Sequence, residues 1–164
     1  MFSPRPFVSL LCVLAYLLLS MTTAPAEEPV TLIGTIVKWR YPEAEIRGAE
    51  MSDGSMMAAN GQRTIPSTLL KTTMSTSDSV EKVMSFYREL LTRNEKNDQK
   101  LGTPAHVGRS VLFSDESDDR PFAFHTILVN EGNASTTIIV TRSKEDKTTH
   151  ITWKQFLRHE IAGK

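Results

Sequence analysis

The stretch Val80-Glu-Lys-Val-Met-Ser-Phe-Tyr-Arg-Glu-Leu-Leu91 decides the fold of this chain. Its apolar side chains recur at intervals of three and four residues, which is the period of one face of an α-helix. Just upstream, Asp78 stands three residues before Glu81, the spacing of a capping box, so we expect Asp78 to cap this helix. A helix with one apolar face needs a second layer to cover it, and the chain on either side predicts a sheet.

Four runs of β-branched and aromatic residues follow, at 110–113, 122–129, 135–142 and 150–154, and polar turns separate them. This arrangement is typical of an antiparallel meander. Two further strands are expected before the helix, at 43–51 and 68–74. We therefore predict an α+β fold with the order β-β-α-β-β-β-β, in which one main amphipathic helix packs on one face of a twisted antiparallel sheet.

Three other segments are less regular. Residues 30–39 are apolar and fit either a strand or a short helix. Residues 52–66 are rich in Gly, Ser, Asn and Ala, which predicts a flexible loop. Residues 94–109 are polar and charged without an apolar stripe, which predicts an exposed connection.

The first 26 residues predict a cleavable export signal. Arg5 is their only charge, an apolar run follows from Phe7 to Ser20, and Ala24-Pro25-Ala26 has the small-x-small pattern of a cleavage site. The apolar run is about 14 residues long, whereas a membrane span needs roughly 20. We expect cleavage after Ala26, an extracytoplasmic (periplasmic or secreted) location and no stable membrane span in the mature chain, although retention of the signal as an anchor stays the alternative.

The expected mature chain, 27–164, has a length normal for a single domain. The single cysteine of the sequence, Cys12, is removed with the signal, so the mature chain is expected to contain no cysteine and no disulfide. The whole chain has 19 Lys and Arg against 19 Asp and Glu, and cleavage removes only Arg5. Such a neutral balance argues against nucleic acid as a partner.

Metal sites find little support. The four histidines, His106, His125, His150 and His159, lack the short spacing of a metal site. His125 and His150 are weak candidates for one, because strand pairing can bring distant residues together, but a histidine bonded across the sheet is the simpler interpretation. We therefore predict no metal, cofactor or catalytic residue.

Two other clusters have ordinary interpretations. Met51, Met56, Met57 and Met74 lack a regular Met-x-Met series and are expected to fill the core and a loop rather than bind copper. The acidic run 115–119 resembles the start of a calcium loop, but Arg120 occupies the glycine position, so a solvated hairpin turn is expected.

Several motifs resemble those of a group of exported bacterial proteins. They are the Tyr41-Pro-Glu-Ala44 segment, the helix around Phe86-Tyr87, and the stretches 108–115 and 124–127. In these the chain is similar to uncharacterised small secreted proteins of planctomycete-type bacteria. The resemblance implies a bacterial exported protein and transfers no catalytic residue.

The sequence contains no glycine-flanked nucleophilic serine, phosphate-binding loop or zinc-protease signature, so it does not support an enzyme. The hypothesis that remains is a non-catalytic extracytoplasmic module that binds a protein or a polymer. The expected binding surface is a sheet face with the threonines Thr126, Thr137, Thr141 and Thr152. A small metal-dependent or hydrolytic enzyme using His125 and His150, and a structural component of an envelope assembly, are the alternatives.

Overall fold

The computed structural model describes residues 32–55, 66–103 and 107–159. The chain divides into two units, Met1–Val30 and Thr31–Lys164, and the described residues belong to the second. The expected signal and its cleavage site therefore lie outside the described residues, as does most of the expected 52–66 loop.

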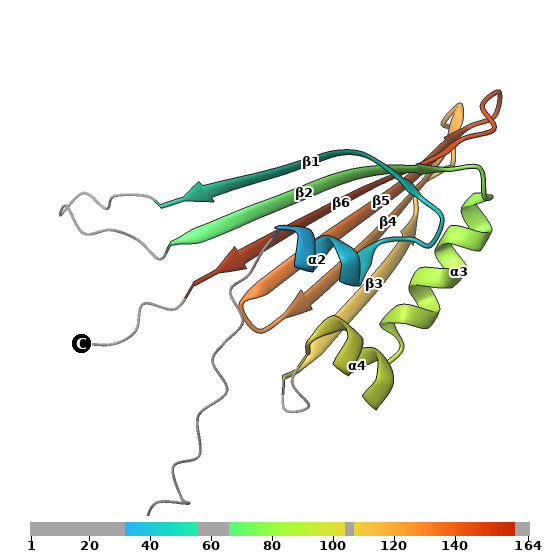
Figure 1. The fold of residues 1–164 in the computed structure, drawn as a ribbon. Coiled ribbons are helices and arrows are strands. Elements are labelled where there is room, and N and C mark those ends of the chain that lie inside the picture. Colours follow the sequence, from blue (N-terminus) through green and yellow to red (C-terminus); the bar gives the residue numbers. More distant parts are fainter. Residues whose placement is uncertain (1–31, 56–65, 104–106, 160–164) are drawn as a thin grey trace, which may run out of the picture. The chain divides into compact units, whose positions relative to one another are not determined.

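Six strands form one antiparallel sheet in the order β1-β2-β6-β5-β4-β3, which can be followed in Figure 1. This confirms the predicted α+β fold, and the expected strands are present, most of them a few residues longer than predicted. Their bounds are β1 Glu45–Gly54, β2 Ser67–Thr76, β3 Arg109–Asp115, β4 Phe122–Glu131, β5 Ala134–Ser143 and β6 Thr149–Arg158. The last four strands form the predicted meander, while β2 pairs with β6 and so places the first hairpin beside the end of the chain.

The two faces of the sheet differ sharply. Residues directly opposite each other on antiparallel strands share a face, so the register assigns every position. One face carries buried apolar side chains, and we call it the covered face. They include Leu70, Met74, Ile127, Val129, Ile138, Val140, Ile151 and Trp153. The buried residues of the helices belong to the same core cluster, so the helices pack on this face.

Helix α3, Val80–Leu91, buries six apolar side chains that recur at helical spacing, namely Val80, Val83, Met84, Tyr87, Leu90 and Leu91. Its cap differs from the prediction by one residue. Ser79, not Asp78, is the N-cap, and its hydroxyl accepts from the Lys82 N–H at 3.3 Å. Asp78 instead accepts from the Tyr41 hydroxyl at 2.7 Å and the Lys82 ammonium at 2.9 Å, so its carboxylate is drawn away from the helix end.

The ambiguous segment 30–39 contains a helix, α2, Leu32–Trp39. Ile36 and Trp39 are its buried residues, and the Trp39 ring lies 6.3 Å from that of Trp153 on the covered face. The Tyr87 hydroxyl donates to the Trp39 carbonyl at 3.1 Å, which ties α3 to the end of α2. Helical spacing of the apolar residues, rather than strand alternation, was the correct interpretation.

The connection 94–109, for which the sequence predicted no helix or strand, contains helix α4, Glu95–Leu101. Asn94 caps its start, and Gly102, with φ of 75°, ends it in the left-handed conformation that glycine adopts readily. The connection is also not uniformly exposed, since Leu101 and Thr103 are buried.

At the end of this connection, the Arg109 side chain is fully buried. It forms ion pairs with Asp98 of α4 and Glu131 of β4, and it donates to the Leu91 carbonyl at 3.4 Å. A buried guanidinium needs such partners to offset the loss of water. The network therefore joins α4, the end of α3 and the β3–β4 edge of the sheet.

In the part of the chain that the structure describes, every helix falls short of the length and apolar character that crossing a membrane requires.

Candidate functional site

The face of the sheet opposite the helices is the first candidate site, and we call it the open face. The register places all four expected threonines on it: Thr126 lies opposite Ile139, Thr137 opposite Lys154, Thr141 opposite His150 and Thr152 opposite Thr73. The threonine-rich face expected from the sequence is therefore present.

Apolar side chains interrupt these threonines. Leu69 and Phe156 lie directly opposite each other on β2 and β6, and both are 41% exposed. Leu112 on β3, which is 63% exposed, lies opposite Leu128 on β4. Leu69 and Phe156 thus form an exposed apolar pair on two neighbouring strands, while Leu112 lies three strands away from β6. Exposed apolar groups that gather on one face are typical of an interaction surface.

Within the strands, the charged side chains of the open face gather on one side, over β1, β2 and β6. Lys71 and Lys154 lie directly opposite each other, and Lys71 pairs with Glu50 at 3.2 Å. Arg158 lies four residues beyond Lys154, so it shares the same face. The side formed by β3, β4 and β5 carries hydroxyl and apolar groups on this face.

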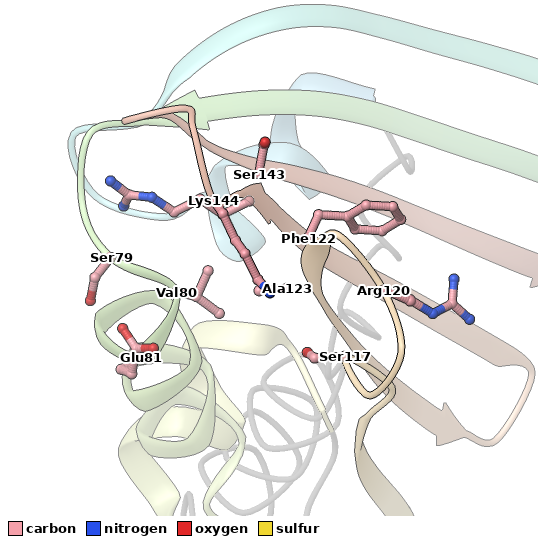
Figure 2. A pocket seen from close by; sticks show the side chains of 10 residues that line it. Ser79, Val80, Glu81, Ser117, Arg120, Phe122, Ala123, Ser143 and Lys144 are labelled. Carbon is pink, nitrogen blue, oxygen red and sulfur yellow. The ribbon is translucent and has the colours of Figure 1, made fainter.

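A second candidate is a cavity of about 430 Å³ at one end of the sheet, beside the start of α3. Figure 2 shows Glu81, Ser117 and the long side chain of Lys144 around it, whereas Phe122 and Arg120 point away from α3. Arg120 lies over the Phe124 ring at 4.6 Å, which belongs to the open face. The polar groups that surround the cavity thus include one carboxylate, one ammonium, several hydroxyls and the guanidinium of Arg142.

The charges of this cavity are largely occupied by the protein itself. Arg142, which also lines it, donates to the Asp78 carbonyl at 3.0 Å and to the Thr149 hydroxyl at 3.3 Å. The pKa of Glu81 lies below its usual range, first because a backbone N–H bonds to the carboxylate and then because the Ser79 hydroxyl does. Two charged groups of the cavity, Arg142 and Glu81, are therefore already bonded within the protein.

His125, Asp115 and Ser117 lie together near the same cavity. The Ser117 hydroxyl donates to Asp115 Oδ1 at 2.6 Å, and His125 Nδ1 lies 3.6 Å from the same oxygen. The bond from Ser117, followed by that from its backbone N–H, lowers the pKa of Asp115. A nucleophilic serine needs the imidazole between itself and the carboxylate, whereas here the carboxylate is in the middle. This arrangement holds the β3–β4 turn and does not activate Ser117.

The structure does not bring His125 and His150 together. His125 lies opposite Val140 on the covered face, while His150 lies opposite Thr141 on the open face. The hypothesis that the two approach each other across strands is therefore corrected, because side chains on opposite faces of a sheet cannot share one metal ion. Among the described residues there is also no group of three or more His, Cys, Asp or Glu side chains placed to hold a metal.

The remaining histidines and methionines are scattered. His159 Nε2 lies 2.7 Å from the Thr68 hydroxyl, and His106 lies outside the described residues. Met74 is buried on the covered face and Met51 is 53% exposed on β1, while Met56 and Met57 lie outside the described residues. The acidic run 115–119 forms the expected turn, with Asp119 at φ of 62°.

Sequence reasoning missed the residues that make the open face distinctive, namely Leu69, Lys71, Leu112, Lys154 and Phe156. The alternation Lys154-x-Phe156-x-Arg158 was a usable signal, because strand residues two apart share a face. Their meeting with Leu69 and Lys71 depends on the β2–β6 register, for which no local signal exists. No sequence motif marked Glu81, Ser117 or Lys144 either.

Comparisons with known proteins add little. No protein-family model matches the chain, and no curated protein matches it. Among solved structures, that of CalU16 from Micromonospora echinospora is similar over 70% of this chain and 73% of that one, with 9% identity and a TM-score of 0.29. A likeness of this size supports no inference about function.

Proposed function

We propose that this chain is an exported, non-catalytic binding module and that the open face of its sheet is the binding surface. The observation that carries the proposal is the exposure of Leu69, Leu112 and Phe156 on a face that no described helix covers. Export is supported by the sequence of residues 1–26 alone.

The open face supports binding better than the cavity beside α3 does. Its apolar and hydroxyl groups extend over five neighbouring strands from β2 to β3, which suits a partner larger than a small molecule. Interfaces of this kind combine a few apolar anchors with surrounding polar groups. We expect Leu112 and Phe156 to be the apolar anchors and the threonines to provide the surrounding polar contacts.

The two alternatives have weaker support. A metal-dependent enzyme using His125 and His150 would need them on one face, which the register does not allow. An envelope assembly through the outer edge of β1, whose ten residues are all exposed, would have to overcome its charged residues and the bulge between Ile46 and Gly48. Charges and bulges on an edge strand hinder edge-to-edge pairing.

The test is retention of a partner from a bacterial envelope or secreted fraction by the immobilised full chain. The open-face double variant Leu112→Ser/Phe156→Ser is compared with Glu89→Ala, which changes an exposed residue of α3. We expect the double variant to lose the partner by about tenfold or more, as loss of anchors does, and Glu89→Ala to keep it. A partner retained equally by the double variant, or hydrolysis of a substrate without any partner, would contradict the proposal.

A further inference from the structure

The pair Lys71 and Lys154 is the most informative feature of the open face. Like charges directly opposite each other on antiparallel strands destabilise a sheet. Lys71 has a carboxylate partner, Glu50, on its other side. Among the described residues no carboxylate pairs with Lys154, so the protein leaves half of this pair without an opposite charge.

This side of the open face as a whole carries more basic than acidic groups. Of its basic groups, Arg47 pairs with Glu45 at 2.9 Å and Lys71 with Glu50, so the two carboxylates that β1 contributes to this face are both in use. Lys154 and Arg158 remain as surplus positive charges in the described part of the chain. The surface would therefore attract a partner that brings its own carboxylates.

Apolar groups lie between these charges. On β6 the side chains of Lys154, Phe156 and Arg158 follow one another along the open face, so the phenyl ring lies between two basic groups. Leu69 lies directly opposite Phe156 and widens the apolar part. We call these residues the basic–apolar strip, and they are Leu69, Lys71, Lys154, Phe156 and Arg158.

We propose that the basic–apolar strip receives a polypeptide segment in which carboxylates flank an apolar side chain. This inference rests on the proposed function, since it names the class of partner for the open face. The apolar side chain of the segment covers Leu69 and Phe156, and its carboxylates pair with Lys154 and Arg158. Binding of this kind depends on salt, because the cations lie near the surface.

Two other classes of polymer fit less well. Nucleic acid binding uses many phosphate contacts, and the strip offers two surplus cations. A polysaccharide would be expected to use exposed flat indole or phenol rings, whereas Trp39, Tyr41, Tyr87 and Trp153 are all buried. The exposed aliphatic and phenyl groups suit polypeptide side chains.

The variant Lys154→Glu separates binding from folding. It gives Lys71 a second carboxylate directly opposite, so the sheet is not weakened by it. At the same time it reverses the charge that we expect the partner to meet. Lys96→Glu, which makes the same change on the exposed surface of α4, is the matched control.

The experiment is selection of random dodecapeptides on the immobilised full chain, followed by affinity measurement for each variant at two salt concentrations. We expect the selected peptides to carry Asp or Glu beside Leu, Ile or Phe. They should bind Lys154→Glu at least tenfold more weakly and Lys96→Glu unchanged, with wild-type affinity falling as salt rises.

The outcomes distinguish the two proposals. Peptides that lose binding to Phe156→Ser but lack carboxylates, or bind Lys154→Glu as well as wild type, would overturn the acidic partner and leave the open face as the binding surface. Selected peptides rich in Lys or Arg would likewise overturn the proposal of an acidic partner. Peptides unaffected by Phe156→Ser, by Leu112→Ser/Phe156→Ser and by Lys154→Glu would contradict the proposed function itself.

Discussion

The phenol of Tyr41 donates a 2.7 Å hydrogen bond to Asp78 Oδ2, and so joins the turn after α2 to the residue before the α3 cap. This bond is the largest cause of the lowered pKa of Asp78. Burial, followed by the bond to Asp78 and its charge, raises the pKa of Tyr41 from 10.0 to about 12. The contact therefore affects stability at both ends of the pH scale.

Tyr41→Phe should make stability less dependent on pH. A lowered carboxyl pKa contributes stability that is present above its unfolded value and is lost as pH falls through the folded value. A raised phenol pKa contributes stability below pH 10 that is lost as pH rises toward about 12. The denaturant midpoint is measured between pH 2 and 12. At neutral pH the midpoint of the variant should be lower than that of wild type, and it should fall less steeply toward both extremes of pH. An unchanged acid decline would show that Asp78 gains nothing from Tyr41. Some alkaline decline will remain, because burial also raises the pKa of Tyr87.

Ser79→Ala tests which residue caps α3. Loss of an N-cap side chain costs about 1 kcal/mol of unfolding free energy, whereas Ser79→Asn keeps a capping oxygen and should be near wild type. Urea unfolding of the three proteins gives the comparison. If Ser79→Ala were as stable as wild type, the Ser79 side chain would not be the cap of α3.

Arg109→Met should be among the most damaging substitutions. It leaves Glu131, whose side chain is 18% exposed, without its cation, while Asp98, 15% exposed, keeps only Arg93 at 3.0 Å. Breaking such a buried ion pair costs about 3 kcal/mol or more. Adding Glu131→Gln to Arg109→Met should recover part of the loss in thermal unfolding, because one buried charge is then removed. No recovery would mean that the carboxylates are solvated without Arg109.

Leu69 and Leu70 provide a matched test of the two faces. Leu70 is fully buried on the covered face and Leu69 is 41% exposed on the open face. Leu70→Ala should cost about 2–5 kcal/mol of unfolding free energy. Leu69→Ala should cost less than about 1 kcal/mol, as surface substitutions do. Comparable losses would indicate that a part of the protein covers the open face.

Local patterns were sufficient for much of this fold. The helix around Tyr87 and the strands after Arg109 follow from periods of 3.6 and 2, because each buries one face. Short polar turns then make neighbours of consecutive strands. Helix α4 was missed since Leu101 is its only buried residue, so no stripe marked it.

Long-range pairing explains what the sequence could not predict. The partner of β2 is β6, and nothing near Lys71 indicates that Lys154 lies opposite. A shift of one residue in register would exchange the two faces of a strand, so the positions of His125 and His150 could not be known either. The cap of α3 was predicted one residue too early for a similar reason. Tyr41, which is distant in sequence, donates a hydrogen bond to Asp78, and Ser79 is the N-cap.

The most direct test of the open face is methyl NMR of the full chain with labelled Ile and Leu, during titration with a peptide selected on it. Methyls of Leu69, Leu112, Leu128 and Ile139 should shift on binding, whereas those of Leu70, Ile127, Ile138 and Ile151 on the covered face should not. Leu69 and Leu70, Ile127 and Leu128, and Ile138 and Ile139 are direct sequence neighbours, so β2, β4 and β5 each carry their own control. Shifts confined to the covered face, or to residues beside the cavity at the start of α3, would contradict the open face as the binding surface.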